Sequence, residues 1–408
     1  MRYSTLTDYF SALHTFQKAN KIDWSVRQGD FFPYASDNIS YWAGYYTSRP
    51  DLKQLSRNAS AVLRMSETAQ VIADAFGLSL LSSPANLTYL RKASALVQHH
   101  DAITGTERRV TYRDYRRRLE DGIQFAQTVA ESAMGRLTGL PSLSTNPAKL
   151  FELLEHHGRA TVVLFNTLEQ TNIQVIKLKV PKILWKRHIQ VTSSGSTVAH
   201  QLSEGLSYGQ KDPDLFVRCE VPALGYQIIL IETSEPIQPS RKEPMKPLRE
   251  EDQVTLENEF IQAHFSGRDG QLVALASRNA EGTFYLTPCV QSMRFYTPVN
   301  DSNQSSDAYV FRPSYEVPIA NLHIVDSRLE RGPLVDQLRI KYNESGVEQV
   351  FRIFKTLPEG ASNFLAVETH LGPLEISRPS TGKEVSGCSG FGCHLIFFRL
   401  LHSLRLIW

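Results

Sequence analysis

Two adjacent histidines and a carboxylate stand together in the segment 98–106, which reads QHHDAITGT. The imidazoles of His99 and His100 and the carboxylate of Asp101 are groups that a zinc ion accepts as ligands. Gly105 follows closely and should end the preceding helix. The three side chains should therefore lie at a corner between a helix and a loop, where functional sites are often built.

The spacing of these residues leaves two interpretations open. Neighbours on a helix point about 100° apart, so His99 and His100 cannot easily bind one ion. In the structural interpretation, one histidine is buried and hydrogen-bonded, the other is on the surface, and Asp101 is a polar residue at a helix end. In the metal-site interpretation, one imidazole binds the ion, the other packs beside it, and further ligands come from elsewhere in the chain.

A longer comparison favours the metal-site interpretation. Segment 98–106 resembles part of the α-mannosidases of glycoside hydrolase family 38. Other segments resemble the same family in the same order, between about residues 5 and 385: 29–34 (GDFFPY), 41–50 (YWAGYYTSRP), 221–226 (VPALGY), 307–313 (DAYVFRP) and 331–335 (RGPLV). The segments at 221 and 331 are closer to the lysosomal type than to the Golgi type. The chain is identified as a member of this family.

The resemblance implies a role for each candidate site residue. His100 would be a zinc ligand, Asp101 would bind sugar hydroxyls, and His99 would lie beside them. Trp42 would be the platform for a mannose ring, because an indole face suits the C–H-rich side of a sugar. Tyr309 would donate its hydroxyl to the sugar. From the residues alone, Trp42 could equally pack between helices, and Tyr309 could be an ordinary strand-end tyrosine.

The resemblance also implies groups that this sequence does not contain. Family members begin with an α/β domain that supplies two zinc ligands in an early His-x-Asp motif, an aspartate nucleophile that also binds zinc, and a second aspartate as general acid. No His-x-Asp-Pro-Gly-Trp string occurs in the 408 residues. We therefore expect a natural N-terminal part to be missing. The Zn²⁺ site should be incomplete and the chain inactive alone, because retaining hydrolysis needs a nucleophile and an acid.

Composition limits the partners. A net charge of +2, with 41% hydrophobic and 21% charged residues, is typical of a soluble globular protein and argues against nucleic-acid binding. The apolar segment Leu395–Trp408 is too short to span a membrane. Cys219 and Cys289 could form a disulfide. The expected partner is a mannose-containing oligosaccharide, and a homo-oligomer is possible.

Glycosylation motifs indicate the compartment. Six Asn-x-Ser/Thr sequons occur, at Asn38, Asn58, Asn86, Asn300, Asn303 and Asn343. This exceeds what a random sequence of this length would carry and favours the secretory route. The start of the chain has no apolar signal core. We expect the lysosome or secretory pathway, with the signal peptide outside this sequence.

The chain should be an α+β multidomain protein. The expected units are the end of an α/β catalytic domain (1–48), a three-helix bundle carrying the His-His-Asp motif (49–140), a first β domain (155–235), an incomplete second sandwich-like β domain (253–385) and an atypical tail (386–408). Apolar residues at helical spacing predict the bundle. Ser48 should cap its first helix and Ser83 its second. Alternating apolar residues from about residue 160 predict strands. The tail shows no clear period, so no strand is expected there.

Two other functions are possible. The chain could be a non-catalytic module that binds glycans or a partner. It could also be a metal phosphohydrolase of the His-Asp helical type, although the bundle offers few further ligands besides Asp114 and Asp121.

Overall fold

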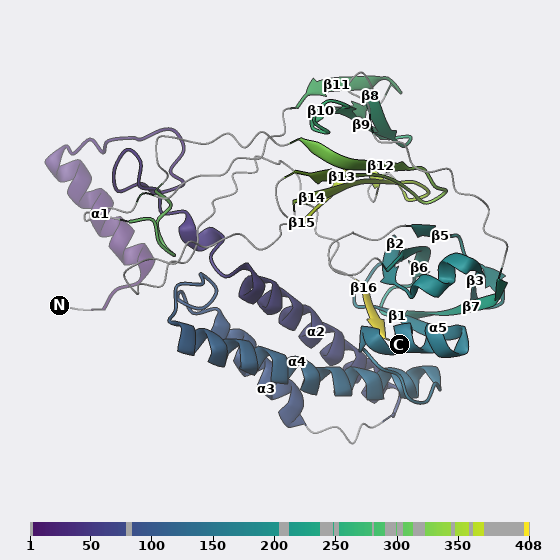
Figure 1. Cartoon of the computed structure of the whole chain (residues 1–408). Coiled ribbons are helices and arrows are strands. Elements are labelled where there is room, and N and C mark those ends of the chain that lie inside the picture. Colours follow the sequence, from purple (N-terminus) through teal and green to yellow (C-terminus); the bar gives the residue numbers. More distant parts are fainter. Residues whose placement is uncertain are drawn as a thin grey trace.

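The structure is a computed structural model of the chain. It describes residues 3–78, 84–203, 212–236, 248, 253–279, 281–289, 299, 305–312, 323–343, 347–358, 362–370 and 404–407. Helices fill the first part of the chain and antiparallel strands most of the rest, so that a helical layer lies beside stacked sheets (Figure 1). The predicted α+β class is confirmed. The domain boundaries remain predictions.

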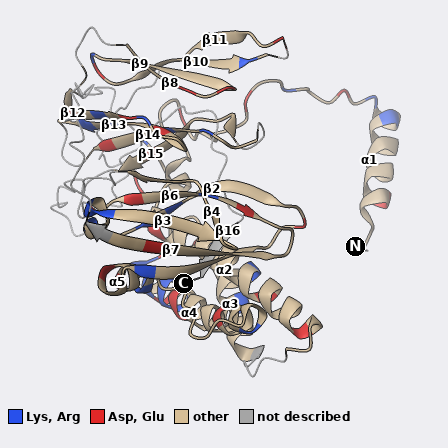
Figure 2. Ribbon diagram, turned by 90° about the vertical axis from the view of Figure 1, so that its right-hand side faces the viewer, with Lys and Arg blue, Asp and Glu red and all other residues tan. Residues whose placement is uncertain are grey.

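The first helix stands apart from the rest of the molecule. Helix α1 (Leu6–Asn20) begins at a capping box, in which Thr5 accepts from the backbone of Asp8 at 3.1 Å and Asp8 accepts from the backbone of Thr5 at 3.3 Å. None of its residues is buried. Figure 2 shows α1 separated from the sheets and the bundle.

Three helices form the bundle: α2 (Pro50–Ala75), α3 (Pro84–Val97) and α4 (Arg109–Thr138). Their shared core is apolar and includes Leu52, Val62, Leu90, Leu119 and Val129. The predicted cap at Ser48 is wrong, because the N-cap residue of α2 is Arg49 and it makes no side-chain cap bond. The Ser48 hydroxyl instead donates to Gly44 O and to Ala308 O.

A fourth packed helix was not predicted from the sequence. Helix α5 (Pro147–His157) is capped by Asn146, whose side chain accepts from Ala148 N at 3.0 Å. Its buried residues Leu150 and Leu154 join the core of the first β region, and α5 lies along strand β1 (Figure 1). The helix therefore covers one face of that sheet.

The first β region contains two antiparallel sheets around one apolar core. The larger has the order β16 (Leu404–Ile407), β1 (Arg159–Asn166), β7 (Tyr226–Pro236), β3 (Arg187–Ser193) and β4 (Ser196–Thr197). The smaller has the order β2 (Asn172–Lys179), β6 (Asp214–Val221) and β5 (His200–Ser203). The prediction of no strand in the tail is wrong, because β16 pairs with β1 from Val163↔Ile407 to Asn166↔Leu404.

The second β region also contains two four-stranded antiparallel sheets. One has the order β11 (Phe284–Pro288), β10 (Leu272–Arg278), β9 (Ile261–Ser266) and β8 (Gln253–Glu257). The other has the order β12 (Ile324–Glu330), β13 (Val335–Tyr342), β14 (Glu348–Phe354) and β15 (Ala366–His370). Their facing side chains form one core, in which the rings of Phe265 and Phe351 lie 4.7 Å apart.

A buried glutamine joins the two β regions. The side-chain oxygen of Gln201 on β5 accepts from Leu334 N and Val335 N, both at 3.0 Å, and its amide donates to Val335 O at 3.0 Å. Beside it, Glu368 on β15 pairs with Lys177 at 2.8 Å and with Arg352 at 2.6 Å. These contacts fix the smaller sheet of the first region against the second region.

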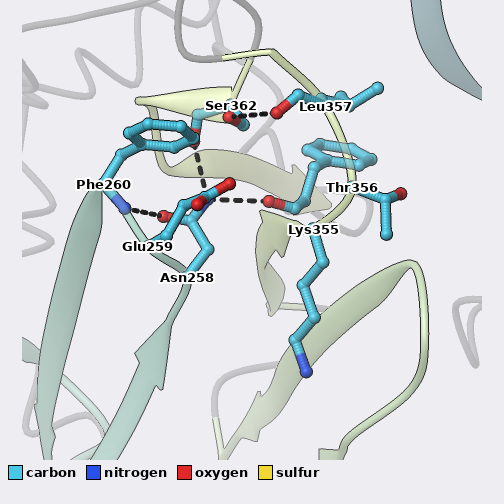
Figure 3. Close-up of a pocket in the computed structure, with 8 residues that line it drawn as sticks. Asn258, Glu259, Phe260, Lys355, Thr356, Leu357 and Ser362 are labelled. Carbon is cyan, nitrogen blue, oxygen red and sulfur yellow. Dashed lines mark hydrogen bonds between the residues drawn. The ribbon is translucent and has the colours of Figure 1, made fainter.

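A small cavity of about 190 Å³ lies between the β8–β9 turn and the end of β14 (Figure 3). The Asn258 amide donates to Phe354 O at 2.7 Å and to Ser362 O at 2.8 Å. Its oxygen accepts from Phe260 N and Ile261 N. Since both ends of this side chain are satisfied, its contacts tie the two sheets together.

Two further observations concern chemistry and the membrane. Cys219 is buried and Cys289 half-buried, and both are free thiols, so the suggested disulfide is not formed. Among the described residues, no helix is both long and apolar enough to cross a membrane.

Candidate functional site

The His-His-Asp motif lies in the turn between α3 and α4. Helix α3 ends at Val97, and residues 98–105 form a series of turns. Gly105 adopts a φ of 75°, and a Cβ placed there would overlap the carbonyl of Ser48. Glycine is therefore required both by the backbone conformation and by the close approach. The turn closes when Thr106 N and Glu107 N each donate to Asp101 O at 3.1 Å.

The two histidines point toward a common region. They lie beyond the end of α3, so the expected separation of about 100° between helical neighbours does not apply. Their ring centroids are 4.4 Å apart. Donor atoms of His99, His100 and Asp101 all lie within 4.8 Å of one another. Because the helix ends before the two imidazoles, the turn sets their relative direction, and the statement that they cannot easily bind one ion stays a prediction.

Asp101 is at the centre of a hydrogen-bond network. Its Oδ1 accepts from the Thr106 hydroxyl at 3.1 Å and from the Tyr309 hydroxyl at 3.3 Å, and its Oδ2 lies 3.3 Å from His99 Nε2. The Thr106 hydroxyl is the largest influence that lowers the pKa of Asp101, and His99 and Tyr309 add to it. Asp101 therefore carries a stable negative charge and remains half-exposed to incoming hydroxyl groups.

Tyr309 reaches this network from a distant part of the sequence. Tyr41 and Phe311 form a two-way backbone bridge, with N···O distances of 3.0 and 2.8 Å, and Gly44 N donates to Tyr309 O at 3.0 Å. Asp307 Oδ1 accepts from Tyr309 N and from Val310 N, both at 2.8 Å. The aspartate thus holds the loop that presents Tyr309.

Trp42 lies next to Tyr309, in the loop before the short 3-10 helix η1 (Gly44–Tyr46). The two rings are 6.3 Å apart in an edge-on arrangement, and the Trp42 indole N–H donates to Ser36 Oγ at 3.1 Å. Trp42 is half-buried, so part of its surface remains open to a ligand. The structure thus brings all five predicted site residues into one region: Trp42, His99, His100, Asp101 and Tyr309.

A second layer of charges fixes the turn from behind. The Arg49 guanidinium pairs with buried Glu107 at 2.6 Å and stacks over the Tyr112 ring at 4.7 Å. Lys53 donates to Ser48 O at 2.6 Å and to Ile103 O at 2.8 Å, and burial lowers its pKa. The sequence reasoning missed these supports. One indication of these contacts was present in the sequence: Arg49 lies in segment 41–50, which resembles the family.

The residues of the turn fit a zinc ion in type. Two imidazoles and one carboxylate are a donor set that zinc accepts. Among the described residues, no further His, Cys, Asp or Glu groups with these three. Asp114 and Asp121, considered for a phosphohydrolase site, instead pair with arginines on their own helix, and these contacts lend no support to that function.

Comparisons with known proteins identify two domain families in the chain. The profile of the α-mannosidase middle domain matches residues 40–137, and that of the glycosyl hydrolases family 38 C-terminal domain matches residues 256–371. Together the two matches cover more than half of the chain. The chain belongs to glycoside hydrolase family 38.

Similar family 38 proteins include lysosomal enzymes. The chain is 28% identical over 400 residues to the lysosomal alpha-mannosidase of Homo sapiens, covering 94% of this chain and 37% of that protein. For the lysosomal alpha-mannosidase of Dictyostelium discoideum the identity is 27% over 427 residues, covering 94% and 40%. The chain thus spans about two fifths of the length of these relatives.

A solved structure has a similar fold. The crystal structure of an alpha-mannosidase from Enterococcus faecalis V583 matches with a TM-score of 0.50 at 16% identity, and it covers 90% of this chain and 46% of that chain. At this identity the match concerns the fold alone. It supports the arrangement of a helical bundle followed by antiparallel sheets.

Proposed function

We propose that this family 38 chain is part of a lysosomal-type α-mannosidase. The whole protein would remove terminal non-reducing α-D-mannose from N-glycan oligosaccharides by zinc-dependent, retaining hydrolysis. The observation that supports this most is the contact between Tyr309 and Asp101 at 3.3 Å. It joins a loop of the C-terminal half to the His-His-Asp turn and leaves Trp42 beside both.

His100 would bind the zinc ion, and His99 would lie next to it. The bound ion would hold sugar hydroxyls and the catalytic carboxylate in place. Asp101 keeps its negative charge through the Thr106 hydrogen bond and would accept hydrogen bonds from sugar hydroxyls. Trp42 would pack against the C–H-rich face of the ring. Tyr309 would turn its hydroxyl from Asp101 to the sugar.

Asp37, a carboxylate close to Trp42 in the sequence, is not suited to act as the general acid. A general acid needs a pKa raised toward the working pH. The pKa of Asp37 is instead lowered, first by the hydrogen bond from Ile39 N and then by those from Ser40. Asp37 is therefore a structural carboxylate, and the chain by itself should bind a sugar without cleaving it.

The test combines turnover and binding. Purified chain with added zinc should release no nitrophenol from 4-nitrophenyl α-mannoside at mildly or strongly acidic pH. Methyl α-mannoside should change the tryptophan fluorescence, and Trp42→Phe should remove that change. Trp185→Phe, in the 3-10 helix η2 (Lys182–Lys186), is the matched control and should keep it. Turnover that a chelator stops and His100→Ala abolishes would refute the expected inactivity.

A non-catalytic role is the second candidate, favoured by the half-exposed Trp42 and Asp101. Binding of the chain to mannose-bearing structures on a glycan array, lost in Trp42→Ala, would support a module that recognises glycans. Restoration of hydrolysis by adding a separately produced N-terminal domain would favour the enzyme fragment instead.

A further inference from the structure

One sequon lies at the edge of the candidate sugar site. The segment Asn38-Ile39-Ser40 forms a tight turn four residues before Trp42. Ser36 N donates to Ser40 O at 3.1 Å, and Asp37 Oδ1 accepts from the backbone of Ile39 and Ser40 at 2.8 and 2.7 Å. This Asx-type turn gives the segment a defined shape.

The Asn38 side chain is free to carry a substituent. The residue is exposed, and its backbone oxygen accepts from the Tyr41 hydroxyl at 3.1 Å. Within the part of the chain that the structure describes, no group is bonded to its side-chain amide. The backbone is therefore fixed while the amide faces solvent.

Other sequons are placed differently. Asn86 lies in the first turn of α3 and is half-buried, whereas Asn38 is exposed. Asn58 lies on α2, is half-buried, already interacts with other groups and lines a groove of about 360 Å³ together with Asp51, Arg116 and Glu120. Arg116 and Glu120, which form an ion pair at 2.8 Å, line the same groove as Asn58. Asn343 Oδ1 accepts from His323 N at 2.8 Å. Asn300 and Asn303 lie outside the described residues.

We propose that Asn38 is an N-glycosylation site and that its glycan stands at the rim of the candidate sugar site. This rests on the secretory route included in the proposed function. The Asn38 amide nitrogen forms a bond to the anomeric carbon of an oligosaccharide carried on a polyprenyl diphosphate. The bond from that carbon to the diphosphate oxygen breaks, the amide loses one proton, and the lipid diphosphate leaves.

The burial of Ser40 sets the order of events. Its side chain is fully buried, with the hydroxyl donating to Asp37 Oδ2 at 2.9 Å. A transferase that must read this hydroxyl can do so only before the turn closes. Asn38 is therefore modified during translocation, and the folded chain is not a substrate.

The location of the glycan follows from the turn. The Trp42 indole donates to Ser36 Oγ at 3.1 Å, so the residue that opens the turn touches the proposed sugar platform. A bulky, hydrated glycan on Asn38 therefore stands beside Trp42. It should hinder branched oligosaccharides more than methyl α-mannoside.

The experiment measures occupancy. The full chain, fused to a signal peptide, is produced in eukaryotic cells, and both retained and secreted protein are treated with an N-glycanase in ¹⁸O water. Peptide mass spectrometry then reports the labelled fraction at Asn38 and Asn58. We expect higher occupancy at Asn38, loss of one glycan mass in Asn38→Gln, and no change in Asn58→Gln. Ser40→Thr, which keeps both hydroxyl and sequon, should stay modified.

An unmodified Asn38, or occupancy at Asn58 equal to or above it, would overturn the proposal. Glycosylation of bacterially produced, folded chain by added transferase and lipid donor would overturn the proposed order. Trp42→Ala should lose sugar binding while Asn38 remains occupied. Failure of the sugar site and failure of the glycosylation site are thus separate results.

Discussion

Replacing Gly105 by alanine should destabilise the bundle and disorganise the candidate site. Two effects act at this position. An L-residue at a φ of 75° costs about 1–2 kcal/mol. The added Cβ also overlaps the carbonyl of Ser48, which cannot easily retreat because Lys53 is bonded to it at 2.6 Å. Overpacking of this kind costs about 1–3 kcal/mol. Together the loss should be about 2–5 kcal/mol.

The chain contains a matched control for the steric part. Gly77, just after α2, has a φ of 70°, and a Cβ there would meet nothing within 4 Å. Gly77→Ala should therefore lower the free energy of unfolding only by the cost of the positive φ, about 1–2 kcal/mol. Urea unfolding followed by helical circular dichroism gives both values, provided that the slopes agree. Methyl α-mannoside binding should be lost in Gly105→Ala and kept in Gly77→Ala. Equal destabilisation by the two substitutions would refute the role assigned to the Ser48 contact.

Three further predictions concern the β regions and Asp101. Gln201→Ala leaves the buried Leu334 N and Val335 N without an acceptor, so the free energy of unfolding measured in urea should fall by about 2–5 kcal/mol. The control Gln262→Ala removes one exposed hydrogen bond to Glu257 and should change this free energy by less than about 0.5 kcal/mol. Thr106→Val should raise the pKa of Asp101 toward its ordinary value in a ¹³C NMR titration, and Thr106→Ser should leave it low; identical titrations in both variants would contradict the hydrogen bond. Burial acts to raise the pKa of Glu368, but the charges of Arg352 and Lys177 outweigh it and hold the pKa at about 2. Since this pKa is depressed, the stabilisation is present above the ordinary pKa and is lost as pH falls toward 2. The stability gap between the native chain and Glu368→Gln should be constant above about pH 5 and close below it, and a gap independent of pH would reject the ion pair as its source.

The sequence could predict much of the local structure. Apolar spacing predicted a three-helix bundle at 49–140, and helices α2, α3 and α4 lie within that range. Alternation predicted strands from about residue 160, and β1 begins at Arg159. These elements bury a periodic face, which is a local property of the chain.

Other features depended on tertiary contacts. Helix α5 is short, and it is stabilised because Leu150 and Leu154 pack against a sheet. The sequence around α5 contains no pattern that predicts this contact. Ser48 was expected to cap a helix, but its hydroxyl donates to Ala308 O, 260 residues away in the sequence. β16 has no period of its own and forms by pairing with β1.

The candidate site shows the same division. The histidine pair could be recognised from residue types, but its geometry depended on where α3 stops. Spacing could not bring Tyr309 to Asp101, because nothing local links segments 208 residues apart. Only the resemblance to the family grouped these residues in advance.

The bond from Ser48 to Ala308 has a consequence for biosynthesis. It joins residues 260 positions apart, and both support the loops of the candidate site. At about 5–20 residues per second, the ribosome needs roughly ten to fifty seconds to make the intervening chain. During that interval the helical bundle can fold, while Gly44 and Ser48 still lack their partners. The nascent protein can therefore pass through a stage in which the helices have formed and the candidate site is not yet complete, and chaperones that bind unfolded surfaces have that interval in which to act.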